Sequence, residues 1–154
     1  MRRLLPSMLL LTLSLPANSA DCFELAARDY QLDPDLLRAI AFRESSFQPT
    51  AMNITDEQRY AVGLMQIHSQ NFTELSRYGI TPQQLYRDPC MNIYTGAYYL
   101  AISIKKMGAV WTGVGGYNAG FAKTPQQAYR REQYAKSVAK IYHHIKAQKP
   151  PITP

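Results

Sequence analysis

The chain has 154 residues, of which 46% are hydrophobic and 18% charged, and its formal net charge is +6. This length fits one folded domain with a single core, and no repeat or linker divides it. The modest positive charge suits an anionic polymer or membrane surface. No basic stripe interleaved with aromatic residues favours nucleic acid, so we expect no nucleic-acid partner.

Residues 1–20 have the features of a cleaved signal peptide. Arg2 and Arg3 give a positive start, residues 4–15 form an interrupted apolar run, and small residues end the segment at Ala20. The run is too short to span a bilayer comfortably, and no later segment is long and apolar enough. We therefore expect an exported protein with no membrane span after cleavage, when loss of the two arginines lowers the net charge from +6 to +4.

Two cysteines follow the expected signal peptide, Cys22 and Cys90. An exported chain enters an oxidising compartment, where an even number of cysteines favours pairing, so a disulfide between them is the leading expectation. Two unpaired buried thiols are the alternative. Together with the scattered His68, His143 and His144, these cysteines lack the spacing of metal ligands, and we expect no metal and no cofactor.

Helical patterns dominate the rest of the chain. The first covers residues 22–30, and the second begins at Pro34 with Asp33 as its N-cap. Residues 48–60 are polar and are expected to form a loop or a small hairpin. Further helices are expected over residues 69–78 with Ser69 as cap, after Thr81-Pro82, and over residues 91–107, 111–119 and 125–146.

These patterns predict an all-α or α+β fold class. We expect a single, mainly helical, disulfide-stapled domain over residues 21–146, with at most a small β-hairpin. Residues 147–154 contain three prolines and are expected to form a flexible tail.

The helix that follows Asp33 carries the first candidate chemical group. Leu37, Ile40 and Ala41 define its apolar face, and Glu44 lies on the same face in the last turn. Apolar neighbours and the negative end of the helix dipole both raise the pKa of a carboxyl group, so this side chain could donate a proton near neutral pH. An exposed glutamate at a fraying helix end is the alternative.

Three further stretches place polar groups where a simple core would not have them. Residues 63–66, Gly-Leu-Met-Gln, set an amide beside bulky apolar side chains, as in a cleft wall. Asn118 offers a donor and an acceptor within residues 116–120, whose small side chains permit close backbone approach. Tyr134 lies in the last expected helix. Taken singly, none of them is specific: a turn, a helix cap and a core residue would explain them, and for residues 63–66 the turn is the favoured interpretation.

The order and spacing of these stretches resemble the lytic transglycosylases with a soluble-lytic-transglycosylase catalytic domain, which is related in fold to goose-type lysozyme. The likeness is greatest to the small exported members that accompany conjugation and type III or type IV secretion machines, and it covers residues 21–145. The matching motifs are Glu44-Ser45-Ser46-Phe47, Gly63-Leu64-Met65-Gln66, Asp88-Pro89-Cys90, Tyr117-Asn118-Ala119-Gly120 and Tyr134. One departure is Gly116, where the family commonly has alanine and where glycine is expected to loosen the helix.

This resemblance implies a lysozyme-like fold, with residues 21–146 as the catalytic domain and Glu44 as the catalytic acid and base. A disulfide between Cys22 and Cys90 is likewise what the closer relatives suggest. The residues implied to bind substrate are Met65 and Gln66 in the sugar cleft, Tyr117 and Asn118 facing the reacting sugar, and Tyr134 near the acid.

The implied substrate is peptidoglycan, at the β-1,4 bond between N-acetylmuramic acid and N-acetylglucosamine. Glu44 would protonate the leaving oxygen and then take the proton of the sugar's own C6 hydroxyl, which attacks C1 and forms a 1,6-anhydro ring. The expected location is the periplasm, where the enzyme would open the cell wall locally for a secretion or conjugation machine. Protein components of that machine are the expected partners.

Two alternatives stay open. Asp56 and Glu57 lie in the polar segment that could form a hairpin across the cleft from Glu44, and a second carboxylate at the reacting carbon would favour hydrolysis, as in a lysozyme-type muramidase. Solvated loop charges are the simpler interpretation of these two residues.

The other alternative is a non-catalytic peptidoglycan-binding subunit of an envelope machine, although binding alone has no need of a proton donor.

Overall fold

The computed structural model describes residues 21–149, so the expected signal peptide and residues 150–154 of the expected tail lie outside the described residues. Helices make up most of the described chain, which confirms the mainly helical fold class. Their bounds are α1 (Cys22–Tyr30), α2 (Pro34–Ser45), the 3-10 helix η1 (Ser69–Asn71), α3 (Phe72–Ser76), α4 (Pro82–Arg87), α5 (Pro89–Met107), α6 (Val110–Ala119) and α7 (Pro125–Gln148). None of these helices is long and apolar enough to cross a membrane.

Side-chain caps begin α1, α2, α4, α5 and α7, whereas the N-caps of α3 and α6 make no such hydrogen bond. Ser69 does not cap a helix, because its Oγ donates to the carbonyl of Gln58 at 2.8 Å and accepts from the N–H of Tyr60 at 3.2 Å. The expected helix is divided into η1, which begins at Ser69, and α3, which ends at Ser76. At the C-terminal end, α7 continues to Gln148, so the beginning of the expected tail is helical.

Three short antiparallel strands pack beside the helices in the order β1 (Met52–Ile54), β2 (Tyr60–Val62) and β3 (Ile67–His68). The first two form the expected hairpin. The third is an addition, because the turn at residues 63–66 returns the chain alongside β2 and pairs Ile67 with Val62. Gly63 takes a φ of +79° in this turn, a conformation that favours glycine.

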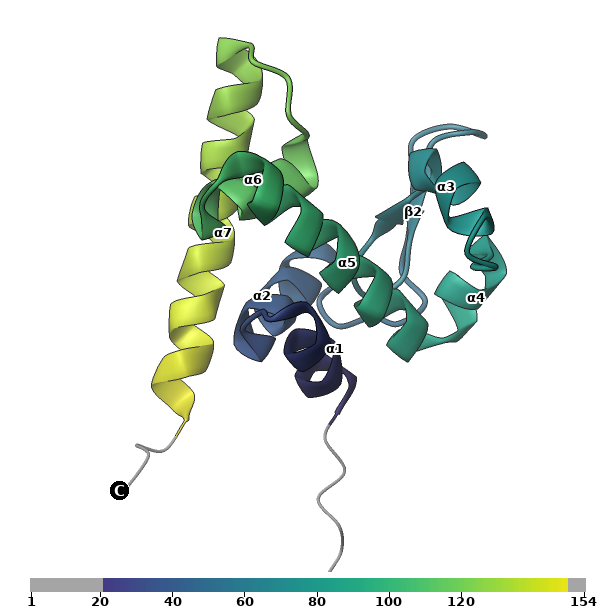
Figure 1. The fold of residues 1–154 in the computed structure, drawn as a ribbon, viewed down its shortest axis with the longest axis horizontal. Helices are drawn as coiled ribbons and strands as arrows, with labels where there is room; N and C mark the ends of the chain where they lie inside the picture. Colours follow the sequence, from purple (N-terminus) through teal and green to yellow (C-terminus); the bar gives the residue numbers. More distant parts are fainter. Residues whose placement is uncertain (1–20, 150–154) are drawn as a thin grey trace, which may run out of the picture.

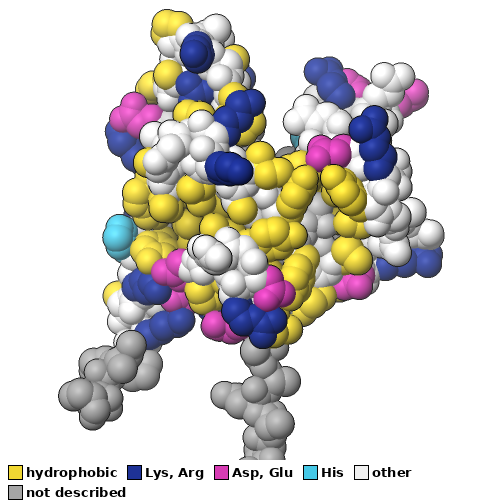
Figure 2. Space-filling view, in the orientation of Figure 1, with side chains coloured by type: hydrophobic (Ala, Val, Ile, Leu, Met, Phe, Trp, Pro, Cys, Tyr) yellow, Lys and Arg dark blue, Asp and Glu magenta, His cyan; other side chains and the backbone are white. Residues whose placement is uncertain are grey.

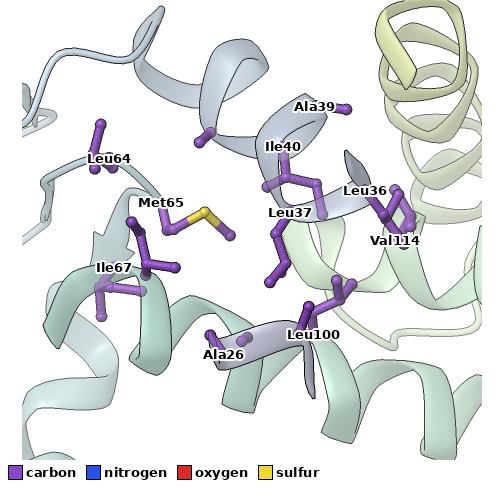
Figure 3. Close-up of a cluster of buried hydrophobic side chains, with 14 of the residues drawn as sticks. Ala26, Leu36, Leu37, Ala39, Ile40, Leu64, Met65, Ile67, Leu100 and Val114 are labelled. Atoms are coloured by element: carbon purple, nitrogen blue, oxygen red, sulfur yellow. The ribbon is translucent and has the colours of Figure 1, made fainter. Parts of the chain in front are cut away.

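Helix α5 crosses the middle of the molecule, with α6 and α7 on one side and the sheet, α3 and α4 on the other (Figure 1). The core lies between α2, α5 and the turn after β2. In Figure 3 the Met65 side chain points toward Leu37 and Ile40 of α2, and all three side chains are fully buried. On the face drawn in Figure 2, hydrophobic side chains gather over the centre, while Lys and Arg are spread around the edges.

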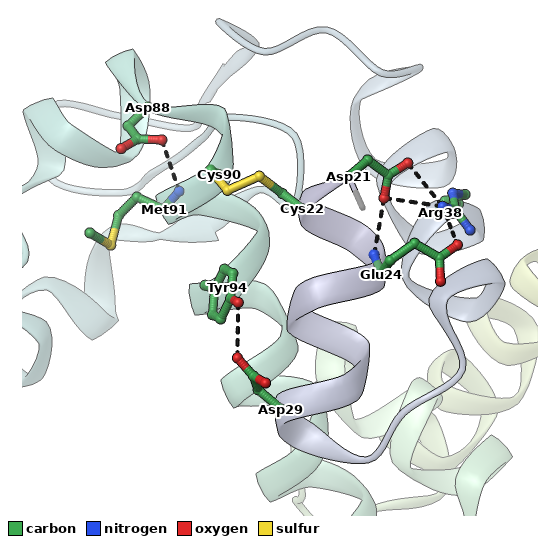
Figure 4. Close-up of a disulfide and its surroundings, with 9 residues drawn as sticks. All are labelled: Asp21, Cys22, Glu24, Asp29, Arg38, Asp88, Cys90, Met91 and Tyr94. Carbon is green, nitrogen blue, oxygen red and sulfur yellow. Dashed lines mark hydrogen bonds and ion pairs between the residues drawn. A yellow bond between two sulfur atoms is a disulfide. The ribbon is translucent and has the colours of Figure 1, made fainter. Parts of the chain in front are cut away.

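The predicted disulfide between Cys22 and Cys90 is confirmed, and it joins the start of α1 to the start of α5 (Figure 4). Its Cα atoms are 5.5 Å apart and its cysteines are 68 positions apart in sequence. A cross-link over a loop of this length stabilises the fold by about 4 kcal/mol in the chain-entropy model. Asp21, just before it, pairs with Arg38 of α2 at 2.9 Å, so the N-terminal segment is fixed to two helices.

A group of charged and polar side chains, here called the α2–α7 clasp, holds the start of α2 against the end of α7. The clasp consists of Asp33, Asp35, Tyr142, Lys146 and Lys149. The carboxylate of Asp35 is fully buried, and Lys146 and Lys149 lie 2.9 and 2.7 Å from its oxygens. The Tyr142 hydroxyl donates to Asp33 at 2.7 Å. The two helices are thereby fixed in one register.

Burial by itself raises the pKa of Asp35, but hydrogen bonds from Lys149, Lys146 and Arg38 outweigh it and hold the pKa at about 2. The pKa in the unfolded chain is near 3.8. Because the folded pKa is depressed, the clasp contributes stability above pH 3.8 and loses it as the pH falls through about 2.

We expect Asp35→Asn to lower the free energy of unfolding by about 2 kcal/mol at pH 7, because it removes the anion that the clasp cations surround. Urea unfolding should show that difference shrinking as the pH falls from 4 toward 2. Asp56→Asn, at an exposed surface pair, is the control and should change stability much less than Asp35→Asn does. If Asp35→Asn lowered the free energy of unfolding by the same amount at every pH, this would contradict the role given to the ionised carboxylate.

Candidate active site

A polar groove of 460 Å³ contains Glu44, the predicted catalytic residue. Its lining comes from the sheet, η1 and α3 on one side and from α6 and the segment after it on the other. Tyr99, Ile102 and Ser103, at helical spacing on one face of α5, lie between these sides. Two other hollows, of 530 and 620 Å³, contain none of the predicted catalytic or substrate-binding residues.

The Glu-Ser-Ser-Phe motif fixes the end of α2 against the turn after β2. Glu44 lies in the last turn of α2, as the sequence predicts. The hydroxyl of Ser45 donates to the carbonyls of Ala41 and Leu64, at 3.0 and 2.9 Å. Ser46 then ends the helix in the left-handed conformation, with a φ of 51°. The backbone that carries Glu44 is thus held from both sides.

Tyr134 of α7 contacts the candidate acid directly. Its hydroxyl donates to Oε1 of Glu44 at 2.5 Å, and its ring is buried. The guanidinium of Arg43 lies 5.7 Å from the centre of that ring, and its Nε donates to Ser137 of α7 at 3.0 Å. These contacts bring together Tyr134 and Glu44 and fix the direction from which the phenol approaches.

The pKa of Glu44 is raised above its ordinary value of 4.5, chiefly because burial disfavours the carboxylate. Three contacts oppose this effect: a hydrogen bond from Tyr134, the positive charge of Arg43 and a hydrogen bond from Asn118. The direction agrees with the sequence-based expectation, and burial is its largest cause. Glu44 can therefore stay protonated at a higher pH than a free glutamate. When it does ionise, the nearby hydrogen-bond donors stabilise the carboxylate.

Tyr117 and Asn118, from the last turn of α6, line the groove next to Glu44. The Tyr117 hydroxyl donates to the carbonyl of Met65 at 2.6 Å. Its pKa is raised well above 10 by burial and by the charge of Glu44, so Tyr117 stays a hydrogen-bond donor. Asn118 is exposed, which leaves its amide accessible to a ligand.

The expectation that Met65 lines the sugar cleft is wrong for its side chain, which is fully buried in the core. Asn92 accepts from the N–H of Met65 at 2.7 Å, and Gly96 leaves room for the side chain, since a Cβ there would lie 2.6 Å from Met65 Cβ. Gln66 does line the groove. Its Nε2 donates to the carbonyl of Gly63 at 2.9 Å, so the amide oxygen is the group left for a ligand.

Gly116 has a packing role instead of loosening α6. A Cβ at this position would lie 2.6 Å from the Oγ of Ser103, a buried hydroxyl that donates to the carbonyl of Gly113 at 2.6 Å. Glycine therefore allows α6 to approach α5 closely, which places Tyr117 and Asn118 over the groove.

Asp56 and Glu57 are not brought to Glu44. Both are exposed in the turn between β1 and β2, and Asp56 pairs with Arg59 at 2.6 Å outside the groove. A different carboxylate, Glu74 of α3, lines the groove instead. Sequence reasoning missed it, because a single glutamate in a short amphipathic helix has no feature that separates it from a surface charge. No group of three His, Cys, Asp or Glu side chains that could hold a metal ion occurs within residues 21–149.

Comparison with known proteins relates most of the chain to one family. Residues 21–140 match the family described as Transglycosylase SLT domain. The chain is 58% identical over 131 residues to X polypeptide from Escherichia coli, covering 85% of this chain and 78% of that protein. It is 36% identical over 134 residues to invasion protein IagB from Salmonella typhimurium, covering 87% and 82% of the two chains. It is 32% identical over 129 residues to protein IpgF from Shigella flexneri, covering 84% of each.

A solved structure has the same fold. An inactive mutant of the lytic transglycosylase Slt from Pseudomonas aeruginosa matches with a TM-score of 0.63 and 24% sequence identity. The match covers 90% of this chain but only 26% of that protein. The likeness therefore identifies the fold of one part of a larger enzyme, and it confirms the expected lysozyme-like transglycosylase fold.

The raised pKa of Glu44 has a consequence for stability. The folded chain binds this proton more tightly than the unfolded chain, so ionisation of Glu44 above pH 4.5 opposes folding. We expect Glu44→Gln to be more stable than the parent at pH 7, because glutamine is neutral and its oxygen still accepts from Tyr134. Urea unfolding should show no such gain at pH 3. Glu57→Gln serves as the matched surface control, and an equal gain for both variants would contradict the burial argument.

Proposed function

The chain belongs to the transglycosylase SLT domain family and is a peptidoglycan lytic transglycosylase, and from this premise we propose that Glu44 is its catalytic acid and base. The bond cleaved is the β-1,4 link between N-acetylmuramic acid and N-acetylglucosamine. The observation that carries the proposal is the position of Glu44: its carboxyl is held by Tyr134 at 2.5 Å, its pKa is raised, and it opens into the polar groove.

The first step is proton donation. Oε1 of Glu44 accepts from Tyr134, so Oε2 carries the proton to the glycosidic oxygen. The bond between that oxygen and C1 of the muramic sugar then breaks, and the bonding electrons leave with the N-acetylglucosamine unit. The muramic sugar is left with oxocarbenium character at C1, and Glu44 becomes a carboxylate.

The second step closes the ring without water. The carboxylate of Glu44 takes the proton of the C6 hydroxyl, whose oxygen attacks C1 of the same sugar. One carboxylate suffices because the nucleophile is tethered, and effective molarities for well-oriented groups can reach about 10⁵ M or more. Tyr134 and Asn118 stabilise the ionised form between the two proton transfers, since their hydrogen bonds lower the pKa that burial raises. Glu44 returns to its protonated state at the end.

We further propose export to the periplasm and a role in opening the wall for a secretion or conjugation machine. Residues 1–20 have the pattern of a signal peptide, and the Cys22–Cys90 disulfide suits an oxidising compartment. The similarity to invasion protein IagB over 134 residues supports a part in such a machine, whose components would be the protein partners.

We expect Glu44→Gln to lower turnover of purified peptidoglycan by about 10³-fold, because the proton donor and acceptor is lost. Sedimentation with the glycan should persist, since glutamine preserves the shape of the groove. Mass spectrometry of the parent's products should show anhydro ends that lack one water. Parent-like clearance by Glu44→Gln would contradict the role of Glu44.

Hydrolysis is the second candidate reaction, and the same product analysis separates the two. The pairing of Asp56 with Arg59 in an exposed turn speaks against a second carboxylate from this segment. Asp56→Asn and Glu57→Gln should therefore keep the turnover and the anhydro products of the parent. Products that carry an added water in the parent, and lose it in either variant, would establish the muramidase alternative.

A further inference from the structure

A second carboxylate faces the groove that contains Glu44. Glu74 lines this groove together with Tyr99, and its two oxygens accept hydrogen bonds from tyrosine hydroxyls of α5. Tyr98 donates to Oε1 at 3.3 Å and Tyr99 donates to Oε2 at 3.2 Å. Glu74 is only partly buried, and within residues 21–149 it forms no ion pair.

The two tyrosines orient this carboxylate but leave some of its hydrogen-bond acceptor positions free. An ionised carboxylate has about four acceptor positions, and the phenols occupy one on each oxygen. The exposed part of the side chain keeps the remaining positions accessible from the groove. Tyr99 and Ile102 provide apolar surface beside it, and a few oriented polar groups on an apolar wall are typical of a ligand site.

We propose that Glu74 is a substrate-binding residue of this enzyme. Its carboxylate accepts hydrogen bonds from hydroxyl or amide N–H groups of a saccharide unit that lies against α3 and α5. The proposal rests on the proposed function, because it takes the glycan as the ligand of the groove. The role proposed for Glu74 is to bind the sugar and not to transfer a proton, because Glu44 makes both proton transfers of the proposed reaction.

The competing explanation is that Glu74 only ties α3 to α5. A substitution of Tyr98 distinguishes the two explanations. Its hydroxyl donates to Glu74 and so links α5 to α3. Its side chain, however, lines the hollow of 620 Å³ beside the disulfide and not the groove that contains Glu44. Tyr98→Phe therefore removes a tie and keeps the carboxylate. Glu74→Gln removes the charge and keeps the size of the side chain.

The first test measures binding without turnover. A peptide-free tetrasaccharide of alternating N-acetylglucosamine and N-acetylmuramic acid is titrated into Glu44→Gln by calorimetry. Adding Glu74→Gln to this background should weaken binding about tenfold, as expected for the loss of one hydrogen bond to a charged acceptor. Adding Tyr98→Phe should change the Kd by less than about twofold. Mass spectrometry of the titrated sample should show the intact tetrasaccharide. Cleavage there would count against Glu44 as the acid, and the second test would then decide the role of Glu74.

The second test uses the active enzyme. Glu74→Gln alone should raise KM about tenfold while kcat and its pH profile stay within about twofold of the parent. Equal weakening by Glu74→Gln and Tyr98→Phe, or parent-like binding by a folded Glu74→Gln, would overturn the proposal. If Glu74→Gln does not fold, Glu74→Asp carries the test. It draws the oxygens back by one methylene, so weakened binding supports the proposal and parent-like binding refutes it.

Discussion

The hydrogen bond from Tyr134 to Glu44 is the contact on which the site depends, because it joins the last turn of α2 to a residue 90 positions later in α7. Neither helix alone brings these two groups together. The α2–α7 clasp ties the start of α2 to the end of α7 around the buried Asp35, so the phenol reaches the carboxyl in one register. The stability of the clasp and the geometry of the acid are therefore two consequences of one packing arrangement.

The electrostatics of Glu44 suit a group that must act first as an acid and then as a base. Burial favours the protonated form, whereas Tyr134, Arg43 and Asn118 favour the carboxylate. A fully apolar environment would make proton donation easy but would leave the conjugate base without partners. In this site the opposing effects leave a net upward shift of the pKa, so both protonation states have stabilising contacts. In the proposed mechanism, the C6 hydroxyl of the bound sugar is the only other reactive group that is needed.

Local signals in the sequence predicted much of the fold, because helix caps, apolar periodicity and paired cysteines act over short distances or have few solutions. Asp33 and Pro34 begin α2 as expected, and Glu44 follows on its apolar face. The grouping of Tyr134 with Glu44 came from the family resemblance and not from periodicity. The direction of Met65 and the position of Glu74 could not be predicted, because each depends on how α5 packs against segments distant in sequence.

The most direct test of the central claim is a titration of the Glu44 carboxyl carbon by NMR in the folded protein, with Tyr134→Phe as the comparison. The account predicts a midpoint above 4.5 for the parent, because burial is the largest effect on this group. It predicts a still higher midpoint for Tyr134→Phe, which removes a hydrogen bond to the carboxylate. A parent midpoint at or below 4.5, unchanged by loss of the phenol hydroxyl, would contradict it.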